Sequence, residues 1–311
     1  MGYIGIGDDA AFIPPSAKGI LISQDMLVEN LHFRLDWMTP EQLGEKAVAV
    51  NVSDIAAMGG TPLSLLTSLS VPSSLDVDWV ESLYRGIAKA LDRYGVVLVG
   101  GDTVGSQDRI TLDVTVIGEP GPFGPILKTG ARPGDRLFVS GRLGAAYAGF
   151  TLLSHGVTWP STVVAERSVL MAHITPMARV RVGQQVGPWA HALTDISDGL
   201  VSELEEITRF GGIGAVIFED RLPIDQATQA MAARFHSRAT DFALFGGEDY
   251  ELLAAVPPSR VTEVQEIEAR TGVVMTEIGV ITEKPGVRMA STEGEKEHVV
   301  QGQIYNHFPV A

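Results

Sequence analysis

Acidic residues recur in this chain beside short apolar segments, in turns marked by glycine or serine. The runs are Gly7-Asp8-Asp9, Ser23-Gln24-Asp25, Asn51-Val52-Ser53-Asp54, Gly100-Gly101-Asp102-Thr103, Asp195-Ile196-Ser197-Asp198-Gly199 and Gly246-Gly247-Glu248-Asp249. Carboxylates that a fold brings close together repel and raise one another's pKa, so such a fold needs a cation. Hard divalent ions take oxygen ligands and bridge substrate phosphates. The pattern therefore predicts several Mg²⁺ ions and phosphate chemistry.

The composition excludes several classes of protein. The chain has 311 residues, enough for two domains, and its net charge of −15 argues against a nucleic-acid partner, which needs a basic patch. The absence of cysteine excludes disulfides, thiolate zinc sites and cysteine nucleophiles. No apolar run reaches the roughly 18 residues of a transmembrane helix. The first residues, Met1–Gly5, lack the basic start and apolar run of a signal peptide. We therefore expect a cytoplasmic protein without a membrane partner.

Apolar periodicity predicts alternating strands and helices in the first half of the chain. The expected elements are a strand over 20–23 that ends before Asp25, a helix from Thr39-Pro40 to Gly59-Gly60, a helix over 77–94, a buried strand over 96–99 ending at Gly100, and a half-buried strand over 110–116. Asn51 and Asp54 lie three apart on the first helix, so both side chains can face one site.

A loop rich in proline and glycine over 118–134 divides the chain into an N-terminal domain over 1–134 and a C-terminal domain over 135–311. In the second unit we expect a strand over 137–141, a helix over 145–153, an apolar segment over 190–194 that leads into Asp195, a helix over 200–210, and a strand over 250–256. The class is therefore α/β (α+β).

Each acidic residue has an ordinary structural interpretation beside the functional one. Asp9 and Asp25 suit turns, and Asp195 and Asp198 flank a helix start, where aspartate often caps. Asp54 is more telling, because a bare carboxylate on an alanine-rich helix face is costly. The joint presence of these residues favours a ligand site. The sequence contains no His-Glu-x-x-His pair, no Gly-x-Ser-x-Gly elbow and no Gly-x-x-x-x-Gly-Lys-Ser/Thr phosphate loop, so a bound nucleotide is held by other means.

Longer runs resemble the thiamine-monophosphate kinase family, which belongs to the ATP-binding superfamily of aminoimidazole ribonucleotide synthetase and selenophosphate synthetase. The matching runs, in the family's order and over essentially the whole chain, are 5–11, 25–29 with His32-Phe33, 47–59, 100–103, 193–200, 245–252 and 305–308. The resemblance implies an N-terminal domain that binds ATP and magnesium and dimerises through its sheet. A C-terminal α/β domain closes over the site.

The resemblance also implies the reaction, a direct transfer of the ATP γ-phosphoryl group to thiamine monophosphate that gives thiamine diphosphate. The acceptor phosphate oxygen is already deprotonated, so no general base is expected. The implied Mg²⁺ ligands are Asp9, Ser23, Gln24, Asp25, Asp54, Asp102, Asp195 and Asp198, the ATP contacts are Gly101, Asp102, Lys128 and Ser197, and the thiamine monophosphate contacts are His32, Glu248 and Tyr305. The implied assembly is a homodimer.

Two departures from the family pattern and two alternative functions remain. The family usually has a further N-terminal segment before the Gly-Asp-Asp motif, and Lys128 stands where arginine is common, which keeps the charge but loses the bidentate fork. One alternative is an ATP-dependent cyclase like aminoimidazole ribonucleotide synthetase, and His32-Phe33 and Tyr305 count against it. The other is a catalytically silent nucleotide-binding subunit, against which the complete acidic set argues.

Overall fold

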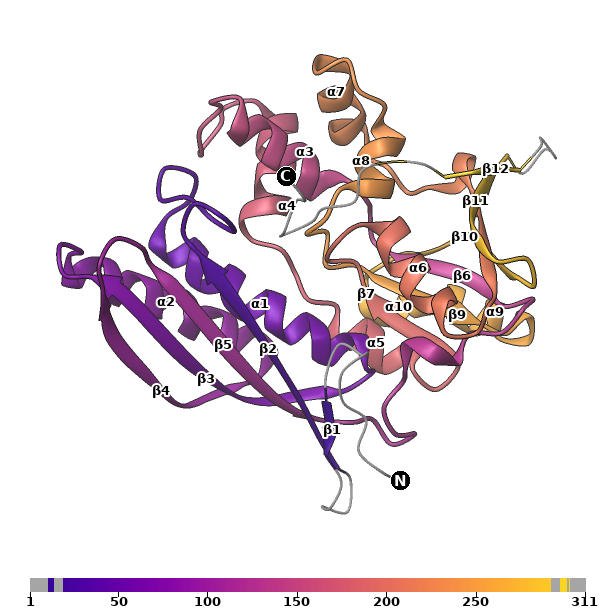
Figure 1. Cartoon of the computed structure of the whole chain (residues 1–311), viewed down its shortest axis with the longest axis horizontal. Coiled ribbons are helices and arrows are strands. Elements are labelled where there is room, and N and C mark those ends of the chain that lie inside the picture. The colour runs from indigo at the N-terminus through magenta and orange to yellow at the C-terminus, as the bar shows by residue number, and fades with distance from the viewer. Residues whose placement is uncertain (1–10, 14–18, 292–296, 301, 303–311) are drawn as a thin grey trace.

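The computed structural model describes residues 11–13, 19–291, 297–300 and 302, which form two sheets with helices between and around them (Figure 1). The first sheet has the strand order β1-β2-β5-β3-β4, in which β3 and β4 are parallel and the other neighbours antiparallel. Its strands are β1 (Ala11–Ile13), β2 (Ile20–Val28), β3 (Thr61–Pro72), β4 (Val97–Ser106) and β5 (Thr111–Glu119), and its helices are α1 (Pro40–Ala57) and α2 (Val77–Tyr94).

The second sheet has the strand order β12-β11-β8-β10-β6-β9-β7. Its strands are β6 (Arg136–Ser140), β7 (Ala192–Asp195), β8 (Gly214–Phe218), β9 (Leu252–Val256), β10 (Met275–Thr282), β11 (Gly286–Ala290) and β12 (His298–Val299). The helices are α3 (Ala145–Ser154), α4 (Val164–Ile174), α5 (Val180–Val186), α6 (Leu200–Arg209), α7 (Gln226–Arg234), α8 (Ala239–Phe245), α9 (Val261–Gln265) and α10 (Ile267–Thr271), with short 3₁₀ turns at 128–130, 219–221 and 258–260. This architecture confirms the predicted α/β (α+β) class, while the boundary at 134/135 stays a prediction.

Helix α1 begins where the sequence predicts. Thr39 Oγ1 accepts a hydrogen bond from the Gln42 backbone N–H, and the Gln42 side chain accepts one from the Thr39 N–H. This capping box satisfies helix donors that would otherwise lack partners. Two glycines let α1 approach α2 closely, since a Cβ on Gly44 would lie 2.2 Å from the Leu83 carbonyl oxygen and one on Gly86 would lie 1.9 Å from that of Glu41.

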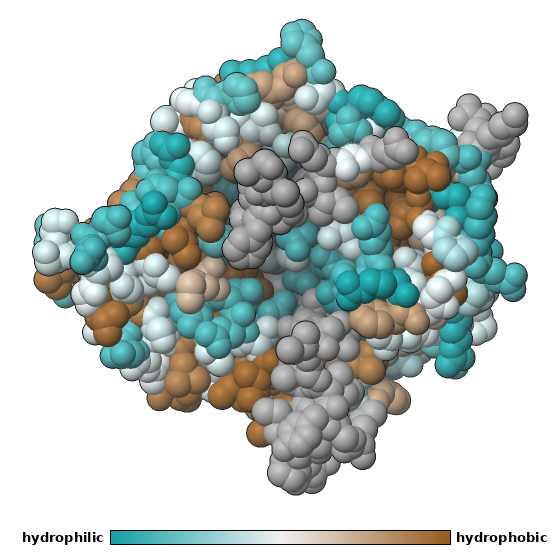
Figure 2. Space-filling view, viewed as in Figure 1, coloured by the Kyte–Doolittle hydropathy of each residue, from teal (hydrophilic) through white to brown (hydrophobic). Residues whose placement is uncertain are grey.

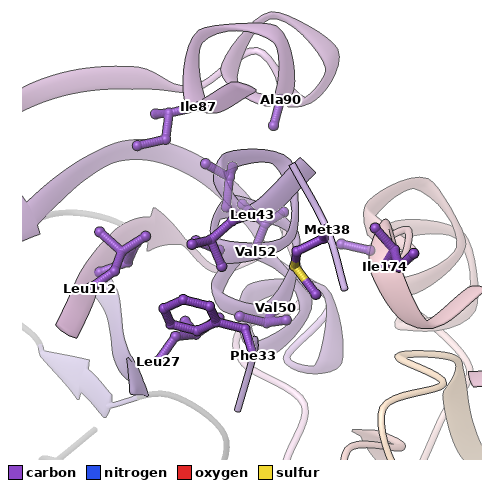
Figure 3. Close-up of a cluster of buried hydrophobic side chains, with 14 of the residues drawn as sticks. Leu27, Phe33, Met38, Leu43, Val50, Val52, Ile87, Ala90, Leu112 and Ile174 are labelled. Carbon is purple, nitrogen blue, oxygen red and sulfur yellow. The ribbon is translucent and has the colours of Figure 1, made fainter. Parts of the chain in front are cut away.

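Helix α1 lies between the two sheets. It packs on β2, β5 and β3 on one side and on α5 and β7 on the other (Figure 1). Buried side chains of β2, α1, α2 and β5 pack together around Phe33, and Ile174 from α4 joins the same cluster (Figure 3). Full burial of a large apolar side chain such as that of Phe33 stabilises a fold by about 1.5–3 kcal/mol. The shared core therefore fixes α1 against elements from both halves.

Strand β2 is longer than predicted. The expected strand ended before Asp25, whereas β2 continues through Asp25 to Val28 and pairs with β5 over this length. Successive side chains of a strand point to opposite faces. Ser23 and Asp25 therefore share the face that α1 covers, and Gln24 lies on the other face.

Strand β4 also differs from the prediction, which ended a buried strand at Gly100. The strand runs on through Gly100 and Gly101 to Ser106, and most of it is exposed. A Cβ on Gly101 would lie 2.2 Å from the Thr67 carbonyl oxygen, so glycine here permits close strand pairing instead of ending the strand. Strand β9 begins at Leu252, two residues after the predicted start. Within the described residues, we find no helix with the length and apolar character to cross a membrane.

Candidate active site

Two polar residues of α1 bond to β2. Asn51 is fully buried, and its Oδ1 accepts from the Asp25 backbone N–H at 2.9 Å while its Nδ2 donates to the Ala47 carbonyl oxygen. Asp54 lies one turn later and accepts a hydrogen bond from Ser23 Oγ. The structure thus confirms that Asn51 and Asp54 face the same neighbour, the face of β2 that carries Ser23 and Asp25.

Ser53, which directly precedes Asp54 on α1, bonds to the other half of the chain. Ser53 Oγ donates to Asp195 Oδ2 at 2.5 Å, and Asp195 is buried at the end of β7. The charges of Asp25, Asp54 and Asp195 all act on the hydroxyl of Tyr250, whose pKa burial and these carboxylates raise well above 10. The hydrogen bonds of Asn51, Ser53 and Asp54 thus bring aspartates of β2, α1 and β7 to one stretch of α1.

The surroundings of Asp25 and Asp195 disfavour the charged form of each carboxyl group. Burial raises the pKa of Asp25, and the charges of Asp198 and Asp113 raise it further. Burial likewise raises the pKa of Asp195 to about 7, against the opposing effects of the Ser53 hydrogen bond and of Lys128. A site with this excess of negative charge and only oxygen donors suits a hard cation.

The donor set fits Mg²⁺ when substrate phosphates complete the coordination. Among the described residues, no three histidine, aspartate or glutamate side chains stand close enough to hold an ion by themselves. Mg²⁺ is commonly bound by one or two carboxylates together with substrate phosphate oxygens. The carboxylates of Asp25, Asp54 and Asp195 are oxygen donors of the type that this mode of binding uses.

Lys128 lies at the edge of this cluster. Its Nζ is 3.4 Å from Glu203 Oε2, and the same glutamate oxygen accepts a hydrogen bond from Thr194 Oγ1. The sequence reasoning missed Glu203 and Thr194. The sequence did offer a signal for Glu203, which lies among the apolar residues of the first turn of α6. A carboxylate buried there is costly unless it has a partner, so a nearby cation could have been expected.

Two glycine-marked motifs run side by side next to the cluster. The backbone N–H groups of Glu248 and Tyr250 donate to the carbonyl oxygens of Ser197 and Ile196, at 2.7 and 2.9 Å. A Cβ on Gly247 would lie 2.4 Å from the Ser197 oxygen, so this approach requires glycine. The pairing places the predicted ATP contact Ser197 beside the predicted substrate contact Glu248.

Both predicted substrate contacts that the structure describes have protein partners. Glu248 is partly exposed, and its carboxylate contacts Lys46 and His173. His32 follows β2 in a turn, where its Nδ1 accepts from the Val28 backbone N–H at 3.0 Å. The Nε2 atom of His32 is therefore the ring atom that carries the proton in the neutral form.

Several predicted residues are not gathered with the others. Gln24 points to the opposite face of β2 and donates to Asp113 Oδ2 at 2.6 Å. Asp102 is exposed on β4, three strands from β2 and so roughly 14 Å away at the usual strand spacing. Gly101 precedes it on the same strand. Asp9 and Tyr305 lie outside the described residues.

A cleft of about 940 Å³ borders the same glycine-marked segment. Asp249 and Glu251 line this cleft, whereas the alternate residues Glu248 and Tyr250 do not. Glu251 is buried and receives two hydrogen bonds from Arg179. None of the predicted site residues that the structure describes lines this cleft, so the acidic cluster and the cleft are separate features.

Comparison with known proteins identifies the family. Residues 7–119 match the AIR synthase related protein N-terminal domain, and residues 132–291 match the corresponding C-terminal domain. The chain is 36% identical to a thiamine-monophosphate kinase of Bacillus subtilis over 98% of this chain and 93% of that relative. The chain belongs to the thiamine-monophosphate kinase family.

Further members of the thiamine-monophosphate kinase family support this assignment. A thiamine-monophosphate kinase of Aquifex aeolicus is 34% identical over 97% of this chain and 92% of its own length. A solved structure of AaThiL complexed with AMPPCP and TMP superposes with a TM-score of 0.86 at 34% identity, covering 97% of this chain and 92% of that one. The family resemblance predicted from the motifs is therefore confirmed.

Proposed function

We propose that this protein is a Mg²⁺-dependent kinase that transfers the γ-phosphoryl group of ATP directly to thiamine monophosphate, giving thiamine diphosphate and ADP. The observation that carries the proposal is that α1 holds Asp54 and bonds to the Asp25 backbone and to the Asp195 carboxylate, which brings aspartates from both halves to one helix. The relatives bear the name of this activity, and a similar solved structure holds AMPPCP and TMP.

Charge neutralisation and alignment are the main tasks of such a site. Two polyanions have to approach each other in line, and the acceptor oxygen needs no general base. Bound Mg²⁺ supplies electrostatic stabilisation of the transferring group. Asp25, Asp54 and Asp195 hold the metal in this proposal, and Ser23 and Ser53 orient two of these carboxylates through their hydroxyl groups.

The remaining predicted contacts complete the proposed site. We propose Asp198 as a further metal ligand, because its charge already acts on Asp25. Lys128 and Ser197 lie along the ATP phosphates, and His32 and Glu248 contact the thiamine monophosphate. We retain Asp9, Gln24, Gly101, Asp102 and Tyr305 as proposed ligands on the family resemblance alone.

We further propose that the protein is a homodimer that assembles through its first sheet and acts in the cytoplasm. The face of this sheet away from α1 exposes Met26, Val97 and Val104, each at least half exposed. Hydrophobic residues are visible on the surface over the strands of the first sheet (Figure 2). A second copy would cover this apolar face and the edge strand β4, which otherwise presents unpaired backbone groups.

A steady-state assay tests the activity. The purified protein is incubated with ATP, Mg²⁺ and thiamine monophosphate, and thiamine diphosphate is measured by chromatography. We expect product only when all three are present. Asp54→Asn should lower turnover at least about 100-fold, since one metal-binding carboxylate is lost.

The control is Asp92→Asn, which alters an exposed aspartate of α2 and should leave turnover unchanged. Both variants should unfold at nearly the wild-type temperature, because asparagine can still accept the Ser23 hydrogen bond. Near-normal turnover in Asp54→Asn would show that Asp54 of α1 is not a metal ligand. Absence of product from the wild-type enzyme would refute the proposed reaction.

A further inference from the structure

A buried ion pair joins the two halves of the molecule beside the acidic cluster. Lys46 lies on α1, its side chain is 1% exposed, and its Nζ is 3.0 Å from Glu248 Oε1 and 3.1 Å from Oε2. The same Nζ donates to the carbonyl oxygen of His173 at 3.0 Å. His173 lies on α4, and its Nδ1 is 2.8 Å from Glu248 Oε2. Two basic side chains, one from each half, thus hold one carboxylate.

Aromatic packing fixes the His173 ring. Its centroid is 6.1 Å from that of Trp37 and 5.8 Å from that of Phe150, with steep angles between the ring planes. Such edge and tilted contacts favour a single ring orientation. The packing therefore helps to hold the ring nitrogen Nδ1 in its position 2.8 Å from Glu248 Oε2.

Glu248 itself is held in an unusual conformation. Its backbone φ is +66°, in the left-handed region that residues other than glycine rarely adopt, and its N–H donates to the Ser197 oxygen. Conformations of this kind persist only where the surroundings enforce them, and they cluster at functional sites. The Glu248 side chain remains 29% exposed although those of Lys46 and His173 are buried, so it is not fully enclosed by protein.

We infer that Lys46 and His173 are positioning residues that hold the Glu248 carboxylate in one orientation for the cationic thiamine moiety of the substrate. The inference rests on the proposed function, which has thiamine monophosphate contacting Glu248. A buried ion pair contributes little net stability compared with apolar residues of similar volume, and fixing one geometry is a role it can serve. Here that geometry also depends on the placement of α1 against the second half.

The ionisation of Glu248 is consistent with this role. Burial alone would raise its pKa, but the charge of Lys46 and the contacts with Lys46 and His173 outweigh burial and hold the pKa well below its usual range. Burial lowers the pKa of His173, and the charge of Lys46 lowers it further, although the charge of Glu248 opposes both. The other titratable groups beside the carboxylate are Asp249 and Tyr250 of the same segment. A carboxylate that stays charged is suited to a thiazolium ring.

A double-mutant cycle in the full-length enzyme tests the inference. Lys46→Met keeps the length of the side chain and removes its charge, and we expect the KM for thiamine monophosphate to rise at least tenfold. The KM for ATP should stay within about threefold, since Lys46 bonds to Glu248 and to the His173 carbonyl oxygen rather than to the proposed metal-binding carboxylates. In a Glu248→Gln background the same substitution should change the KM for thiamine monophosphate by less than about threefold, because the residue it acts through is already neutral.

A second variant and a matched control complete the experiment. His173→Phe keeps the aromatic packing, removes the ring nitrogen that contacts Glu248, and should also raise the KM for thiamine monophosphate while leaving that for ATP unchanged. Lys89→Met removes a lysine of α2 that pairs with Glu45 of α1 rather than with Glu248, and it should leave both KM values unchanged. The pH profile adds a further readout. The KM of Lys46→Met for thiamine monophosphate should rise as the pH falls from about 8 to about 5, because Glu248 loses the cation that opposes protonation.

The outcomes separate this inference from the proposed function. Thiamine diphosphate formation by the wild type, with fully additive effects of Lys46→Met and Glu248→Gln, would overturn the positioning role and leave the kinase standing. An equal rise in both KM values in Lys46→Met and His173→Phe would also overturn it, because that result indicates a general structural defect. A wild-type enzyme that forms no product would overturn the proposed function and the inference together.

Discussion

Replacing Arg179 with methionine should destabilise the protein far more than an ordinary surface substitution. Arg179 Nε and an Nη donate to the two carboxylate oxygens of Glu251 at 2.7 and 2.6 Å, a bidentate pair. The Glu251 side chain is 6% exposed and that of Arg179 is 26% exposed. The variant leaves a buried carboxylate with only the Ser140 hydroxyl as a side-chain donor among the residues that the structure describes. Breaking a buried pair in this way costs about 3–5 kcal/mol.

The chain contains a matched control for this burial argument. Arg260 and Glu263 form an ion pair with the same short N···O distance of 2.7 Å, but their side chains are 51% and 30% exposed. Exposed pairs contribute about 0–1 kcal/mol. Arg260→Met should therefore lower the free energy of unfolding by no more than about 1 kcal/mol, although the chemical change is identical.

Urea denaturation followed by circular dichroism measures both costs on the same protein. At roughly 2–4 °C per kcal/mol, Arg179→Met should also lower the thermal midpoint by roughly 6–20 °C. The pair Arg179→Met with Glu251→Met should recover part of the loss, since it removes the stranded charge and adds apolar volume. Equal destabilisation by Arg179→Met and Arg260→Met would refute the argument that burial sets the cost.

Three further substitutions test other parts of the structure. Gly247→Ala should lower stability by about 1–3 kcal/mol and reduce turnover, because its Cβ would lie 2.4 Å from the Ser197 oxygen; thermal unfolding and the kinase assay measure both. Thr39→Ala removes the α1 cap and should cost about 1 kcal/mol in urea denaturation. Because the pKa of Asp195 is raised from 3.8 to about 7, its contribution to stability is full below about pH 4 and is lost as the pH rises through about 7. We therefore compare the free energies of unfolding of Asp195→Asn and the wild type by urea denaturation with a chelator present. The advantage of the variant should be about 2 kcal/mol larger at about pH 8 than at about pH 5.5. An advantage that does not change with pH would contradict the raised pKa of Asp195.

Local signals in the sequence were sufficient for the helix boundaries of the first half. Thr39-Pro40 begins α1 with a capping box, and Gly95 ends α2 in the left-handed conformation with φ of +68°. Both signals act within one turn of the residue concerned. Their interpretation needs no knowledge of the tertiary structure, which is why the predicted and observed bounds agree.

Strand bounds and side-chain partners depended on distant parts of the chain. Gly100 and Gly101 looked like a strand end, but the pairing of β4 with β3 makes glycine a requirement for close approach. The position of Asp102 depends on the order of the strands in the sheet, which the periodicity of one strand does not contain. Lys46 and Glu248 are 202 residues apart, so no local pattern could pair them.

The polar residues of α1 connect the fold to the candidate site. A helix buried between two sheets pays a desolvation cost for each polar side chain unless that side chain is hydrogen-bonded. Asn51 and Asp54 bond to β2, Ser53 bonds to Asp195, and Lys46 bonds to Glu248. Rotating or sliding α1 would break bonds to both halves at once, so the contacts that gather the carboxylates also set the orientation of the two sheets. The site and the domain arrangement therefore depend on the same four residues.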